Sequence, residues 1–117
     1  MGVYEVSDEA MIIYLPKELD HYAADKIREK CVKVFEENRI MVLIFDFDKT
    51  TFMDSSGIGL VTGRFRVVHD NGGKVYVINV NEHIDKILEM SGIYRIICKK
   101  ETKEDIINEM VAGGYYE

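Results

Sequence analysis

The chain has 117 residues, of which 47% are hydrophobic, with nine glycines and one proline. This length suits one domain with one core, and the composition argues against a disordered or low-complexity chain. Fifteen basic and twenty-one acidic residues leave a net charge of −6, which disfavours a nucleic-acid backbone as partner and favours a basic protein surface.

The sequence carries no signal for a membrane span or for secretion. No run approaches the roughly 18 apolar residues that a span requires. The start, Met1–Glu5, has no basic region followed by an apolar one. We therefore expect a cytoplasmic protein.

The first residues predict a β-hairpin followed by a helix. Val3–Val6 and Ala10–Leu15 predict two short strands joined by the polar turn Ser7–Glu9. Apolar residues three and four apart then predict a helix from His21 to Asn38. Asp20 stands at its N-cap position.

The middle of the chain changes from a strand pattern to a helix pattern. Met41–Phe47 is an almost continuous apolar run, typical of a strand buried on both faces. After it, apolar residues at helical spacing predict a helix that ends near His69, with this buried stripe: Ile58, Val61, Phe65 and Val68. Between them, Phe52–Gly59 supplies two hydroxyls, a carboxylate and two glycines where a helix leaves backbone N–H groups free. Such a junction can present a reactive side chain.

A purely structural junction accounts for the same spacing. Asp54 and Ser55 are both good N-cap residues, and Gly57 and Gly59 let a helix begin close to a sheet. Local physics alone therefore leaves both interpretations of the junction open.

The second half predicts a strand at Lys74–Val80, a short helix at Glu82–Met90 and a last strand at Tyr94–Cys98. Thr102 and Asp105 resemble a capping box. The final helix then has this apolar stripe: Ile106, Ile107, Met110 and Val111.

Strands that alternate with helices predict a compact α/β domain with right-handed crossovers. Its sheet is mixed but mainly parallel, with about four or five strands and about four helices. Loops after parallel strands gather at one edge of the sheet, so the Pro16–His21 loop and the Asp54–Gly57 junction are expected to be neighbours.

The cysteines and histidines indicate no metal site and no cofactor. Cys31 and Cys98 are far apart in apolar surroundings and form no C-x-x-C pair, so we expect two buried, reduced thiols. His21, His69 and His83 stand singly at polar helix ends, where we expect solvated side chains.

Three landmarks give the chain a family resemblance. Phe52–Gly59, together with Glu18–His21 upstream and Met90–Gly92 downstream, resembles the STAS domain family, and within it the anti-sigma factor antagonists of bacterial sporulation and stress response. The resemblance runs from about Tyr4 to about Met110. It implies one STAS-like domain over residues 1–117, and Gly113 and Gly114 predict a tail that frays from about residue 113.

The same resemblance implies a phosphorylation switch and no enzymatic activity. It implies that Ser56 is phosphorylated by a partner kinase that is itself the anti-sigma factor, and that a serine phosphatase resets it. It also implies that the unmodified protein binds the kinase and thereby releases a sigma factor. Asp20 matches an acidic position that contacts a basic residue of the kinase, although it also fits a helix cap. The implied partner-binding residues are Asp20, His21, Asp54, Ser55, Ser56 and Gly57.

The chain departs from the family pattern at Pro16-Lys17, where relatives commonly carry a small residue and glycine. The departure bears on which partner is bound. We place no nucleotide site, because the chain has no phosphate-cradling glycine loop. Leu60, Arg64 and Val67 lie beside the buried stripe of the second helix; they could form a further partner patch, but such residues are more often the periphery of the core.

Two other functions compete with this interpretation. One is a STAS adaptor module in another signalling complex. The other is a phosphatase, because Asp46–Thr50 fits the D-x-D-x-T signature of haloacid dehalogenase-like enzymes, in which the first aspartate attacks phosphorus and a magnesium ion bridges the oxygens. The chain is short for that fold, the motif follows a middle strand and no later acidic pair completes a metal site. We therefore expect Asp46 and Asp48 to be polar residues at a strand end.

Overall fold

The computed structural model describes residues 3–112, and at its centre lies a five-stranded sheet in the order β1-β2-β4-β6-β7. The first pair is an antiparallel hairpin, and the remaining neighbours run parallel. The strands span Val3–Ser7 (β1), Ala10–Tyr14 (β2), Val42–Asp46 (β4), Lys74–Ile78 (β6) and Cys98–Lys99 (β7). The predicted mixed, mainly parallel sheet is confirmed.

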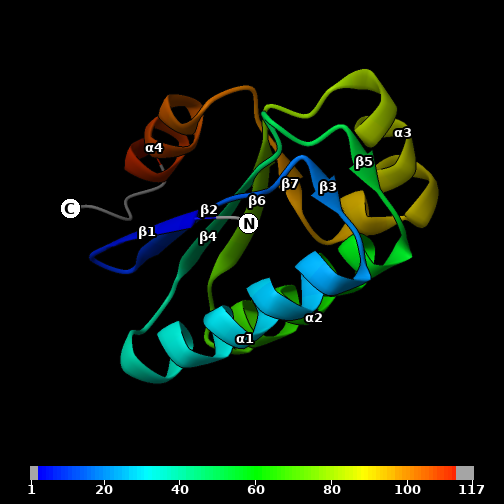
Figure 1. Cartoon of the computed structure of the whole chain (residues 1–117). Helices are drawn as coiled ribbons and strands as arrows, with labels where there is room; N and C mark the ends of the chain where they lie inside the picture. The colour runs from blue at the N-terminus through cyan, green and yellow to red at the C-terminus, as the bar shows by residue number, and fades with distance from the viewer. Residues whose placement is uncertain (1–2, 113–117) are drawn as a thin grey trace.

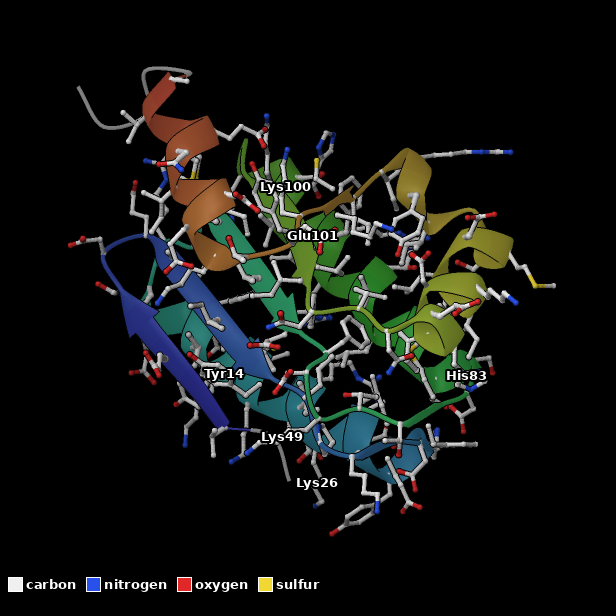
Figure 2. All side chains as sticks on the ribbon, turned by 90° about the horizontal axis from the view of Figure 1, so that it is seen from above. Tyr14, Lys26, Lys49, His83, Lys100 and Glu101 are labelled. Carbon is white, nitrogen blue, oxygen red and sulfur yellow. The ribbon has the colours of Figure 1, made fainter. Side chains whose placement is uncertain are left out.

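Helices cover both faces of this sheet (Figure 1). They span His21–Glu37 (α1), Ser55–Asp70 (α2), Glu82–Ser91 (α3) and Lys103–Ala112 (α4). Side chains alternate along a strand. Leu43 of β4 belongs to the core cluster that includes residues of α1, α2 and α3, whereas its neighbour Val42 belongs to the cluster with residues of α4. Seen from above, Lys26 of α1 and Lys100 before α4 lie on opposite sides of the sheet (Figure 2). No helix within residues 3–112 is long and apolar enough to cross a membrane.

Capping residues fix the helix starts where the sequence predicts them. The Asp20 carboxylate accepts a hydrogen bond from the backbone N–H of Ala23 at 2.9 Å. Thr102 and Asp105 form the expected capping box, because each side chain accepts from the other residue's backbone N–H, at 3.1 and 3.2 Å. These bonds satisfy N–H groups that a helix start leaves without partners.

The predicted strand at Tyr94–Cys98 is wrong in most of its length. Ile93–Arg95 forms a 3₁₀ helix (η1), and only Cys98 continues into β7. The cause is Gly92, whose φ of +80° ends α3 in the left-handed region. The Tyr94 hydroxyl then donates to the Asp85 carboxylate at 2.6 Å and anchors the segment to α3.

Two expectations about burial are also wrong. Ile107 and Val111 of α4 are 43% and 58% exposed, because α4 covers the sheet with only one narrow stripe, Ile106 and Met110. Of the residues beside the stripe of α2, Leu60 belongs to the main core, Arg64 is half-buried and Val67 is exposed. Cys31 is buried, but Cys98 is only partly so, and both are free thiols. The expected fraying after residue 112 lies outside the described residues.

Candidate functional site

A second, two-stranded sheet that the sequence does not predict brings the starts of two helices together. β3 (Glu18–Leu19) pairs in parallel with β5 (Phe52–Met53). The ladder continues on both sides, because the backbone N–H of Thr51 donates to the Lys17 carbonyl at 2.8 Å and that of Asp54 to the Leu19 carbonyl at 3.4 Å. Figure 1 shows β3 and β5 side by side, with α1 and α2 running from them along the same face. The expected proximity of the two loops is therefore confirmed.

The junction between β5 and α2 is much shorter than the sequence suggests. Only Asp54 separates Met53 from the first helical residue, Ser55. The Asp54 carboxylate accepts the backbone N–H of Ser56 at 2.8 Å, and its carbonyl accepts that of Gly57 at 3.0 Å. Asp54 is thus the N-cap, and both serines lie in the first turn of α2.

Gly57 lets α2 begin directly against the small sheet. A Cβ atom at this position would overlap Cγ of Met53 and lie 2.7 Å from its sulfur and 3.0 Å from Cδ2 of Leu19. Both neighbours are buried, so the close approach requires a residue without a side chain. Gly59 has no such neighbours within 4 Å.

The half-buried Ser56 faces the start of α1. Its Oγ atom lies 3.4 Å from Nδ1 of His21. The other ring nitrogen, Nε2, lies 3.2 Å from Oδ2 of Asp25, one turn along α1. Oδ1 of Asp25 accepts a hydrogen bond from the Arg28 guanidinium. His21 is exposed, as expected for a solvated side chain, yet it connects the two helices. The spacing of His21 and Asp25, four residues apart on one helix, is a signal that the sequence predictions missed.

Two exposed aromatic side chains flank this site. Tyr22 of α1 is 70% exposed, and Phe52 of β5 is 46% exposed. Tyr22 lines a groove of about 410 Å³ whose other lining residues include Pro16, Lys17, Glu18, Asp20 and Lys26. No pattern in the sequence separates these aromatic residues from core residues. They add apolar contact area to a surface that otherwise carries charges.

The first aspartate of the D-x-D-x-T segment has a structural role. The Asp46 carboxylate accepts the backbone N–H of Asp48 at 2.9 Å and the Asn79 side-chain amide at 3.0 Å, which ties the ends of β4 and β6 together. Asp48 is exposed. Among the described residues no group of three or more His, Cys, Asp or Glu side chains is placed to hold a metal ion.

Known proteins match this chain over most of its length. Residues 3–107 match the family model described as "STAS domain". An "Anti-sigma F factor antagonist" from Lysinibacillus sphaericus is 34% identical over 92% of this chain and 94% of its own length. The solved structure of the "Anti-Sigma Factor Antagonist SpoIIAA in its Unphosphorylated Form" has a TM-score of 0.75 at 30% identity and covers 94% of this chain and 97% of its own. The "Bacillus Cell Fate Determinant SpoIIAA in the Phosphorylated Form" has a TM-score of 0.74 at 32% identity and covers 94% of this chain and 99% of its own. These matches confirm the resemblance that the sequence predicts.

Proposed function

We propose that this chain, which belongs to the STAS domain family, is an anti-sigma factor antagonist that binds an anti-sigma factor with serine kinase activity and is switched off by phosphorylation of Ser56. A serine phosphatase resets the switch. The names of its relatives support the function class, and the solved phosphorylated form of one relative supports a phosphate-controlled state. In this role the protein works in the cytoplasm and acts by binding rather than by catalysis.

The observation that carries the proposal is the placement of Ser56. Its hydroxyl lies in the first turn of α2, next to the start of α1. A helix start tolerates a phosphate, because its N–H groups and dipole favour negative charge. The fold therefore accepts the modification, and the effect of about two added charges and their bulk falls on the surface that meets the partner.

That surface combines charge with apolar contact. Asp20 and Asp54 end the two small strands at the same edge, and the protein's net charge is −6, which favours a partner with basic groups. Tyr22 and Phe52 supply exposed aromatic area, the kind of side chain that often dominates binding energy. Phosphate in the middle of this surface needs to cost only about 2.7 kcal/mol to weaken binding a hundredfold.

Incubation with candidate anti-sigma kinases and ATP, followed by mass spectrometry, tests the assignment. We expect phosphate on Ser56, no uptake by Ser56→Ala and normal uptake by the matched control Ser55→Ala. Loss of uptake in Ser55→Ala alone would move the site to the neighbouring serine. No uptake with any such kinase would favour the alternative, a STAS adaptor in another signalling complex.

Stability and binding should separate in the modified protein. Ser56→Asp and the phosphorylated chain are expected to keep the parent's melting temperature within a few degrees while losing the kinase, and Ser56→Ala is expected to bind constitutively. Calorimetry and pull-down on the same samples measure both properties. A large drop in melting temperature would show that phosphate acts by disrupting the fold instead of the surface.

A further inference from the structure

The contacts of His21 point to a role that follows from, and rests on, the proposed phosphorylation of Ser56. Nδ1 of His21 lies 3.4 Å from Oγ of Ser56, and Asp25 lies 3.2 Å from the opposite ring nitrogen. An imidazole held at Nε2 by a carboxylate keeps a proton on that nitrogen. Nδ1 is then the nitrogen that faces the hydroxyl to be modified.

Two carboxylates cap the helices that meet beside Ser56, and Lys17 and Lys26 line the groove next to Asp20. Asp54 caps α2, Asp20 caps α1, and Asp25 stands behind the ring. Arg28 is already engaged with Asp25. A phosphate on Ser56 would therefore lie at the helix start that Asp54 caps, and His21 is a group within 3.4 Å of the Ser56 hydroxyl that can become a cation.

We propose that His21 receives the phosphate of phosphorylated Ser56, as an imidazolium that Asp25 orients and that holds the phosphate against the start of α1. Phosphate oxygens extend beyond Oγ toward the ring, and the exposed ring has room to turn to meet them. His21 is thus a positioning residue of the switch. The held phosphate lies beside Asp20, so its bulk occupies the part of the surface that the kinase is proposed to contact.

The size of the effect follows from exposure. The His21 side chain is 79% exposed, so the ion pair resembles an exposed pair, which changes an equilibrium by a factor of about 1.5 to 5. A phosphoserine is about half dianionic near pH 6. A neighbouring imidazolium favours the dianion, and we expect a ratio of dianion to monoanion about threefold higher than without the ring.

The test installs phosphoserine at position 56 during translation, in the full chain, and needs no kinase. The ³¹P resonance at pH 6 reports the dianion fraction. We expect the ratio of phosphoserine dianion to monoanion to fall about threefold in His21→Gln and by less in Asp25→Asn. In His69→Gln this ratio should stay at the parent value. His69 is the matched control, because it is exposed and lies at the far end of α2, about 20 Å along the helix from Ser56.

The proton resonances of the two rings give a second reading in the parent protein. Phosphorylation should move the His21 ring signals and leave those of His69 in place. If the ³¹P ratio is the same in the parent and His21→Gln, or if the His21 signals do not move, the phosphate points to solvent and the inference is wrong. Because the phosphate is installed directly, this result is independent of whether any kinase modifies Ser56.

Discussion

Gly57→Ala tests whether the close contact between α2 and the small sheet holds the site in place. The new Cβ would overlap Met53 and approach Leu19, which are 4% and 0% exposed and have little free space around them. Overpacking of this kind costs about 1 to 3 kcal/mol, while replacing glycine within a helix returns at most about 1 kcal/mol. We expect a net loss of about 1 kcal/mol or more.

Gly59→Ala is the matched control, two residues further along the same helix. No atom lies within 4 Å of the point that its Cβ would occupy, so the substitution should gain about 0.5 to 1 kcal/mol from helix propensity alone. The two variants should differ by about 2 kcal/mol, or about 8 °C in melting temperature for a chain of this size.

Urea denaturation followed by far-UV circular dichroism measures both variants against the parent. The midpoints should move in opposite directions with unchanged slopes, because neither substitution alters the surface exposed on unfolding. If Gly57→Ala is as stable as Gly59→Ala, α2 does not need to approach the small sheet closely, and the account of how Ser56 is positioned fails.

Three further predictions concern other parts of the chain. Asp20→Asn should keep the stability of the parent, since asparagine caps a helix equally well, but it should weaken kinase binding. Asp20→Ala should weaken binding and also lose about 1 kcal/mol of unfolding free energy. If Asp20→Asn binds the kinase as well as the parent does, Asp20 is a helix cap only. Burial raises the pKa of the Cys31 thiol to about 11, so a thiol reagent at pH 8 should label Cys98 in the native protein and Cys31 only after unfolding. Rapid labelling of both cysteines in the native protein would contradict the packing of α1. The hydrogen bond from Tyr94 lowers the pKa of the Asp85 carboxyl below its usual 3.8, so the ionised carboxylate adds stability above pH 3.8 that is lost as the pH falls through the lowered pKa. Tyr94→Phe should therefore cost about 1 kcal/mol of unfolding free energy at pH 7 and less at pH 3. An equal cost at both pH values would rule this linkage out.

Elements with a regular apolar period were predictable from the sequence. Val42–Phe45 is buried throughout, and α1 begins at the capping residue expected for it. The small β3-β5 sheet was not predictable, because each strand has two residues and its ladder joins segments 34 positions apart. Periodicity reports on single elements, whereas these strands exist only because their loops already lie together.

The candidate site was likewise predictable from the sequence only in part. Asp54, Ser56 and Gly57 were identified by motif, and the structure places them in one turn. Asp25 was missed, because it matters only once the ring of His21 is known to turn toward Ser56. The four-residue spacing predicts that Asp25 and His21 contact each other on one helix, but the direction of the ring toward Ser56 depends on rotamers and tertiary contacts, which spacing does not specify.

A buried polar contact explains how the scaffold behind Ser56 can stay in place while the surface changes. Thr50, fully buried, donates from its hydroxyl to the Pro16 carbonyl at 2.9 Å, and its own carbonyl accepts from the Asn81 side chain at 2.9 Å. Proline lacks an N–H but keeps its carbonyl, so the departure at Pro16-Lys17 preserves this bond. The loops before β3 and β5 are therefore fixed to each other and to the start of α3. Because breaking such buried bonds costs about 1 to 3 kcal/mol each, a phosphate at the exposed end of the site is expected to change what the surface binds before it changes how the loops are held.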